Sequence, residues 1–207
     1  MSLLLVDVAI VGGGILLGRW IVRRMRARGP GAEMVAVEAK ERPAPKRDPL
    51  AGFPCKLGDV LVRVAERDEA WLAGALVLEE EHPVAVIFVA PEAGGDRAVL
   101  VRPPPSPGLV WLAPLKPGEL ALTADPPHSL EHGGARYQRV RRLPVTVSRI
   151  GSGAPAVGAQ AIVAEYEGGG TDRIVVLAGA QQTLTWKGVA LGEGDYDVLP
   201  GDGSTLE

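Results

Sequence analysis

The chain has 207 residues: positions 1–52 carry 9 Lys and Arg against 5 Asp and Glu (net +4), and positions 53–207 carry 13 against 20 (net −7). An acidic body excludes nucleic acid as an expected partner, because phosphate binding needs a basic face. The single cysteine, Cys55, excludes an intramolecular disulfide framework.

Residues 1–28 predict a transmembrane anchor followed by a basic collar. Positions 3–22 are almost entirely apolar, and 20 helical residues rise about 30 Å, which matches the hydrocarbon thickness of a bilayer. Asp7 lies near the amino terminus of this stretch, where a carboxylate can reach the interface. The residues that we expect to anchor the chain in the membrane are Leu3, Arg19, Trp20, Val22, Arg23 and Arg24.

Other interpretations of this segment differ in what surrounds the helix. A cleaved signal peptide is disfavoured, because its positive charge should precede the apolar run and here it follows. The helix could instead be buried in a soluble domain, or pack inside a larger assembly. In the membrane interpretation the collar lies on the cytoplasmic side. We therefore expect a single-pass inner-membrane protein with its amino terminus outside and its body in the cytoplasm, in contact with membrane lipid.

Gly14 and Gly18 form a GxxxG spacing within the predicted span. Small residues four apart lie on one helix face and let two backbones approach closely. This spacing favours self-association of the helix into a homo-oligomer.

After the anchor, the residue composition and the pattern of apolar runs predict a linker and then a body of short strands. Residues 29–52 mix Pro, Gly and charge without periodicity, which is typical of a linker, and residues 201–207 form a tail. Short apolar or β-branched runs bounded by Gly, Pro or charge predict strands at 59–64, 71–78, 84–89, 98–101, 109–112, 144–149, 161–167, 173–177, 183–186 and 196–199.

The two halves of the body resemble each other in sequence. Trp111 and Trp186 are 75 residues apart, and each follows an Arg-led apolar run by 13 or 14 residues. We therefore expect a mainly β protein in which an N-terminal transmembrane helix precedes two similar antiparallel sheet- or barrel-like units, at 53–125 and 131–200.

A family resemblance covers residues 55–200. Its motifs are Lys56-Leu57-Gly58-Asp59-Val60, Trp111-Leu112, Tyr137, Val145-Thr146-Val147 with Gly158, and Trp186-Lys187-Gly188-Val189 with Leu191. On these motifs the body resembles the bacterial domain-of-unknown-function family 4178, and it departs from that family's pattern at Ala73-Gly74-Ala75. The resemblance implies a small β-rich module without an established activity, and a role in the membrane stress response.

Few residues carry the spacing that catalysis or metal binding needs. His128 and His132 are four apart and could take zinc on a helix, but the flanking Pro and Gly pairs predict a loop, and no third ligand has a suitable spacing. Cys55 is expected to pack as a small apolar residue beside Phe53. We therefore expect no catalytic, cofactor-binding or metal-binding residues.

Two further motifs could bind partners. Arg139, Arg141 and Arg142 form a basic patch that could hold a phosphate or could be a solvated strand edge. The proline-rich run at 103–107 could dock an aromatic groove or simply be a stiff loop.

Three functions are compatible with these patterns. The leading expectation is a membrane-tethered, non-catalytic β-module that acts as an interaction or scaffold protein for an unidentified protein partner. The second is an enzyme or ligand-binding domain whose site combines distant residues such as Asp59, His82 or His132. The third is a structural subunit of a larger assembly.

Overall fold

The computed structural model describes residues 48–91, 96–105, 108–122 and 125–201. The predicted transmembrane helix, the basic collar and nearly all of the predicted linker lie outside these residues. Within the described ranges, no helix has the length and apolarity needed to cross a bilayer.

The described residues form twelve β-strands. They are β1 (Val60–Arg63), β2 (Glu69–Trp71), β3 (Gly74–Glu79), β4 (Pro83–Ala90), β5 (Arg97–Val101), β6 (Leu109–Pro114), β7 (Ser129–His132), β8 (Ala135–Gly151), β9 (Gln160–Glu167), β10 (Asp172–Gly179), β11 (Thr183–Leu191) and β12 (Tyr196–Leu199). The prediction of a mainly β body is therefore confirmed.

Most predicted strands are present, and three predictions need correction. The predicted strand at 71–78 is two strands, because the chain leaves the β1–β2 sheet at Leu72 and joins the barrel at Gly74. The predicted loop around His128 and His132 contains β7, which pairs with the start of β8. The strand predicted at 144–149 lies within the second half of β8, whose 17 residues run from Ala135 to Gly151.

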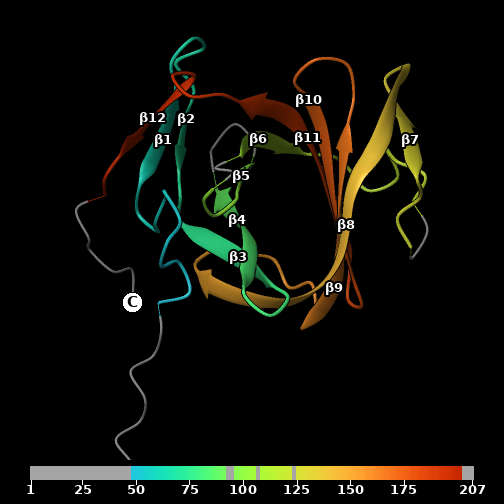
Figure 1. The fold of residues 1–207 in the computed structure, drawn as a ribbon, viewed down its shortest axis with the longest axis horizontal. Helices are drawn as coiled ribbons and strands as arrows, with labels where there is room; N and C mark the ends of the chain where they lie inside the picture. The colour runs from blue at the N-terminus through green and yellow to red at the C-terminus, as the bar shows by residue number, and fades with distance from the viewer. Residues whose placement is uncertain (1–47, 92–95, 106–107, 123–124, 202–207) are drawn as a thin grey trace, which may run out of the picture. The chain divides into compact units, whose positions relative to one another are not determined.

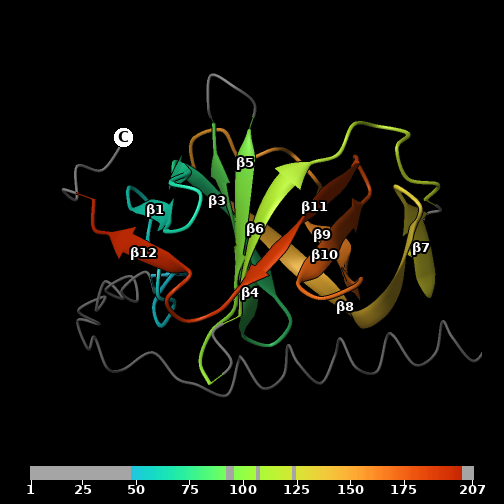
Figure 2. The ribbon, with the colours of Figure 1, turned by 90° about the horizontal axis from the view of Figure 1, so that it is seen from above.

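Eight strands close into an antiparallel barrel (Figures 1 and 2). The strand order is β3-β4-β5-β6-β11-β10-β9-β8, and β8 pairs back onto β3. Each run of four consecutive strands, β3–β6 and β8–β11, is a meander, and the two meanders meet at the seams β6–β11 and β3–β8. Strands from both predicted halves thus build one barrel.

The barrel interior is filled by apolar side chains that alternate along every strand, since successive residues point to opposite faces. The members are Leu76, Leu78, Ala85, Ile87, Ala98, Leu100, Val110, Leu112, Val145, Val147, Ala161, Val163, Val175, Leu177 and Trp186, together with Ala154 and Val157 from the β8–β9 connection. Eight strands enclose a space that side chains of this size can fill.

Two further apolar clusters lie against the outer wall of the barrel. A three-stranded sheet in the order β12-β1-β2 packs Leu61 and Ala70 over the outward side chains of β3–β6. On the opposite flank, where β7 lies (Figure 1), Leu130 of β7 and Leu120 from the chain before it pack against Tyr166 of β9. Apolar side chains therefore pack on both faces of the barrel wall, inside the barrel and beneath the two outer clusters.

Trp111 and Trp186, the corresponding tryptophans of the two predicted units, lie in different environments in the fold. Trp111 points outward into the cluster beneath the three-stranded sheet, whereas Trp186 points into the barrel. At the seam their strands pair Trp186 with Pro114 and Val189 with Trp111. The similar spacing of the two tryptophans from the preceding Arg-led runs, 14 and 13 residues, does not place them in the same environment.

Candidate functional site

The predicted anchor residues and the Gly14 and Gly18 pair lie outside the described residues. Residues 1–46 and 47–207 separate into two units, and only the second contains described residues.

Asp59, His82 and His132, which one hypothesis combined, lie on three different elements. Asp59 is buried before β1, where its Oδ2 accepts a hydrogen bond from the Lys56 N–H (2.8 Å) and its Oδ1 accepts one from the Gly201 N–H (3.0 Å). His82 is exposed in the β3–β4 turn, and His132 ends β7. Asp59 therefore joins the first strand of the body to the last, which is a structural role.

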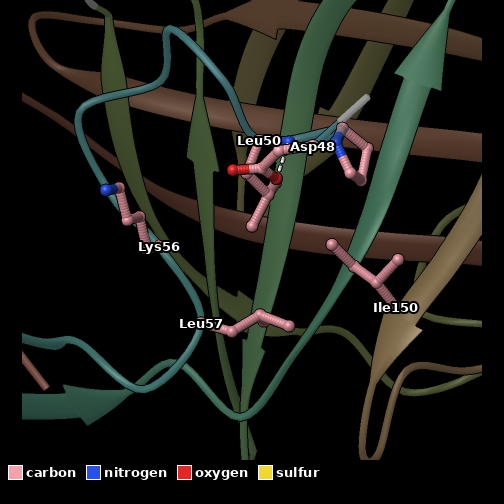
Figure 3. Close-up of a pocket in the computed structure, with 6 residues that line it drawn as sticks. Asp48, Leu50, Lys56, Leu57 and Ile150 are labelled. Carbon is pink, nitrogen blue, oxygen red and sulfur yellow. Dashed lines mark hydrogen bonds between the residues drawn. The ribbon is translucent and has the colours of Figure 1, made fainter. Parts of the chain in front are cut away.

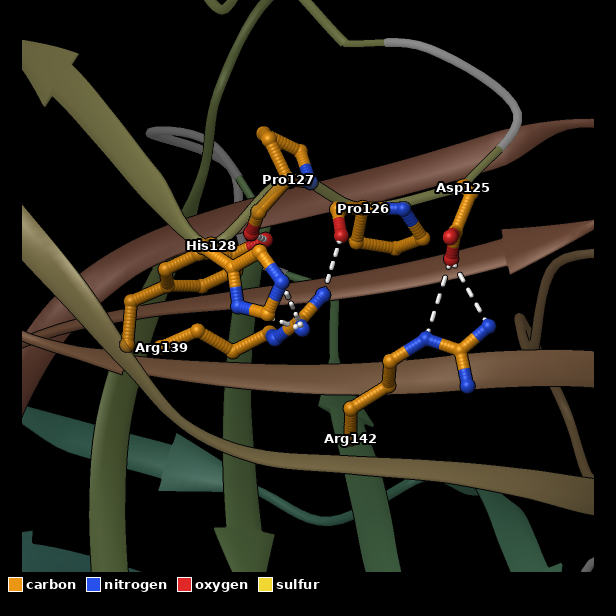
Figure 4. Close-up of polar contacts among 7 residues, drawn as sticks. Asp125, Pro126, Pro127, His128, Arg139 and Arg142 are labelled. Carbon is orange, nitrogen blue, oxygen red and sulfur yellow. Dashed lines mark hydrogen bonds and ion pairs between the residues drawn. The ribbon is translucent and has the colours of Figure 1, made fainter.

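The basic patch is engaged with the chain that precedes β7 (Figure 4). Arg139 donates to the Pro126 carbonyl and lies 2.9 Å from His128 Nδ1. Arg142 donates from Nε and Nη2 to Asp125 Oδ1, at 2.9 and 2.8 Å. These contacts fasten residues 125–128 to β8, so the arginines hold a connection in place.

The third arginine of the patch, Arg141, does not contact residues 125–128 in this way. Its side chain extends to Glu165, at one end of the barrel interior. There the Glu165 carboxylate, 5% exposed, lies between Arg102 and Arg141, with Arg141 Nη1 3.4 Å from Glu165 Oε1. Arg173 pairs with Glu167 at 3.3 Å in the same part of β9. A cluster of charged side chains therefore occupies this end of the barrel.

Cys55 is fully buried beneath the three-stranded sheet. Burial, followed by the nearby Asp59 carboxylate, raises the pKa of its thiol to about 11. A thiol with this pKa is protonated at neutral pH and is a poor nucleophile, in agreement with the packing role expected of it.

A shallow hollow lies between the first described residues and the end of β8 (Figure 3). Leu50, Leu57 and Ile150 line it, with Asp48 and Lys56 at its border, and its volume is about 330 Å³. The Asp48 side chain accepts a hydrogen bond from the Leu50 N–H (2.9 Å), which closes a turn. Among the described residues, no group of three or more His, Cys, Asp or Glu side chains could hold a metal ion.

The outward face of the three-stranded sheet carries an exposed apolar row. In the strand register Val60 of β1 lies between Trp71 of β2 and Leu199 of β12. Trp71 is 42% exposed and Leu199 is 52% exposed. Directly opposed residues on neighbouring strands have Cβ atoms about 5 Å apart, so the three side chains form a continuous strip.

Acidic side chains border this strip. The next row of the same face has Val62 between Glu69 and Asp197, both exposed. Residues 60–71 and 193–199 contain six acidic residues and two basic ones, a net charge of −4. One of the two, Arg63, is already held by Glu66 at 2.5 Å and by Asp68 at 3.4 Å. We call Val60, Val62, Glu69, Trp71, Asp197 and Leu199 together the Trp71 face.

Sequence reasoning did not find the Trp71 face, although it predicted strands at 59–64 and 196–199. Which side of β1 faces solvent depends on its packing over the barrel, and the distant β12 supplies Leu199. One signal was available: Trp71 follows Glu69 with Ala70 between them, the alternation of a strand whose other side is buried.

Comparison of the chain with protein-family models, with curated proteins and with solved structures returned no match.

Proposed function

We propose that this chain is a non-catalytic interaction module, tethered at the cytoplasmic face of a bacterial inner membrane, that docks a protein partner on its Trp71 face. Residues 3–22 provide the tether, and the linker at 29–52 holds the body away from the bilayer. Self-association through Gly14 and Gly18 and a role in the membrane stress response, which the resemblance to family 4178 implies, belong to this proposal. The two sequence-related units correspond to the two four-stranded halves of the barrel.

The exposure of Trp71 is the observation on which the proposal rests. Tryptophan is enriched at interaction hot spots because its large side chain buries much apolar area on binding. Trp71, Val60 and Leu199 form one contiguous strip, and such exposed strips mark interaction surfaces.

The charge around the strip specifies the partner. Glu69 and Asp197 lie beside the apolar row, and the face as a whole is acidic. A complementary protein segment presents one apolar side chain to Trp71 and has Lys or Arg on either side. Complementary charges of this kind steer association and select among partners.

Photo-crosslinking in cells tests the docking. p-Benzoylphenylalanine is placed at Trp71 in the full chain, and at Val140 as a matched control. Val140 is also apolar and is 54% exposed, but it lies on β8 in the other half of the barrel. We expect a discrete adduct from position 71, none from position 140, and loss of the adduct in a Glu69→Lys, Asp197→Lys background. Equal adducts from the two positions, or an adduct that survives the charge reversal, would contradict the proposal.

Alkaline carbonate extraction tests the tether separately. The full chain should stay in the membrane pellet, and Leu16→Asp should move it toward the supernatant, because a carboxylate in mid-span costs about 2.5–3.5 kcal/mol. A wild-type chain recovered in the supernatant would refute the tether but leave the docking face standing.

A further inference from the structure

The end of the barrel opposite Glu165 is partly closed by the connection between β8 and β9. Residues 152–159 fold back over this end and insert Ala154 and Val157 into the interior core. The Gln181 N–H donates to the Val157 carbonyl at 3.2 Å, and the Gln182 side chain donates to the Ala156 carbonyl. The connection is thereby fixed to the β10–β11 turn and acts as a plug.

The plug does not fill the whole mouth of the barrel. Between it and the ends of β4, β5, β6 and β11 a pocket of about 390 Å³ remains, and we call it the barrel-end pocket. This volume lies within the range of pockets that hold small molecules, about 300–1,000 Å³. The residues that line it are Val89, Pro91, Asp96, Arg97, Pro114, Gly153, Pro155, Leu184 and Trp186.

Most of the pocket wall is apolar and is held in place by strand pairing and by proline rings. Trp186 is 4% exposed and sits in β11, where its backbone pairs with both β6 and β10. Three prolines contribute to the lining, and their rings hold φ fixed and offer no N–H donor. A pocket with walls held in this way is formed before a ligand arrives, so little ordering cost opposes binding.

The polar groups lie together on one side of the pocket. Arg97 is the first residue of β5, and the exposed Asp96 directly precedes it. A carboxylate and a guanidinium from consecutive residues of the lining supply both an acceptor and donors, so they suit a neutral hydroxyl or amide better than a full charge. The other lining side chains are apolar, so the rest of the ligand must be apolar too.

We propose that the barrel-end pocket binds a small ring-bearing molecule that is mostly apolar and has one neutral polar substituent. The ring lies against Trp186 and Leu184, and the substituent reaches Asp96 and Arg97. This site is separate from the Trp71 face, which lies on the three-stranded sheet. A negative result for ligand binding in the pocket therefore leaves the docking proposal standing, and the reverse also holds.

Photoaffinity labelling of the full chain tests this site, with 4-[3-(trifluoromethyl)diazirin-3-yl]benzyl alcohol as the probe. The probe has one aromatic ring and one hydroxyl, and peptide mass spectrometry locates its adducts. We expect labelling of the peptides that contain Leu184 and Trp186 to saturate with a dissociation constant below about 1 mM. Excess benzyl alcohol should reduce this labelling by competing with the probe for the pocket, and this control uses the wild-type chain. Adducts in residues 3–22 would arise from probe dissolved in lipid or detergent. Their yield should rise linearly with probe concentration, and benzyl alcohol should not reduce it.

Two variants, Leu184→Phe on β11 and Val89→Phe on β4, fill the pocket from different strands. Each should reduce the saturable labelling at least tenfold, whereas Val140→Phe, on the exposed outer surface, should leave it unchanged. Circular dichroism and the melting temperature identify the variants that retain the fold. Labelling at Trp186 that does not saturate, that benzyl alcohol does not displace, or that persists in a folded filling variant would overturn the proposal.

Discussion

The charged end of the barrel allows a quantitative prediction about one buried carboxylate. Glu165→Gln keeps the shape of the side chain but removes the negative charge between Arg102 and Arg141. Breaking a fully buried ion pair costs about 3–5 kcal/mol. Here the Arg102 and Arg141 side chains are 27% and 31% exposed, so water compensates part of the loss. We therefore expect a cost of about 2 kcal/mol, intermediate between buried and surface pairs.

Glu167→Gln is the matched control for this change. Glu167 is two residues along the same strand, points to the same face and pairs with Arg173 at 3.3 Å, but it is 49% exposed. A pair this exposed contributes about 0.5 kcal/mol or less. The strand, the residue type and the substitution are the same, so the two variants differ in the burial of the carboxylate and in its number of arginine partners, two for Glu165 and one for Glu167.

Thermal unfolding of the full chain in detergent, followed by tryptophan fluorescence, measures both variants. For a body of this size, about 1 kcal/mol lowers the melting temperature by about 2–4 °C. Glu165→Gln should therefore lower it by about 4–8 °C, and Glu167→Gln by about 1–2 °C or less. The larger shift should persist in about 1 M salt, where only exposed pairs are strongly screened. Equal shifts in the two variants would show that burial of Glu165 does not determine its contribution.

Two other substitutions test the packing. Gly188→Ala should abolish folding or lower the melting temperature by more than Glu165→Gln does, because the new Cβ would lie 1.8 Å from the Trp111 carbonyl oxygen. Gly169→Ala is the control, since a Cβ at that position would have no neighbouring atom within 4 Å. A soluble Gly188→Ala variant with the native fold would contradict the geometry of the β6–β11 seam. The pKa of the Cys55 thiol is about 11 in the folded protein against an ordinary 9.0. Between these two values the thiol loses its proton in the unfolded chain but keeps it in the folded one. The contribution of Cys55 to the free energy of unfolding is therefore complete below pH 9 and is lost as the pH rises toward 11. Urea unfolding of Cys55→Ala should therefore show a smaller decline across this pH window, and an identical decline would count against burial as the cause.

Local patterns were sufficient to predict many strands but not how they pair. Val84 to Val89 and Ala161 to Glu167 were predicted within a residue or two of their observed limits, because runs of β-branched residues end at Pro, Gly or charge. The local pattern predicts a continuous strand through Leu72, since nothing in the nearby sequence marks the point at which the chain changes sheets. The seams β6–β11 and β3–β8 join residues about 75 apart, and no pattern within a short window specifies such pairing.

The missed elements share a polar composition. β7 reads Ser-Leu-Glu-His, and the first half of β8 has four arginines among nine residues, so neither looks like a strand by composition. Their partners supply the reason that they are strands: Leu130 and Tyr137 face a cluster on the barrel wall, and the arginines reach distant carboxylates and carbonyls. The barrel-end pocket was missed for a related reason, because its lining comes from five separate stretches of chain.

The two seams have a consequence for how the chain reaches its native state. Within each meander, neighbouring strands are joined by short connections and can zip together locally, whereas the seams require encounters between segments far apart in sequence. Loop-closure entropy opposes such encounters, and proteins rich in them fold slowly. Until both seams form, the edges of β3, β6, β8 and β11 expose unpaired N–H and C=O groups. A nascent chain at this stage is vulnerable to strand exchange with its neighbours.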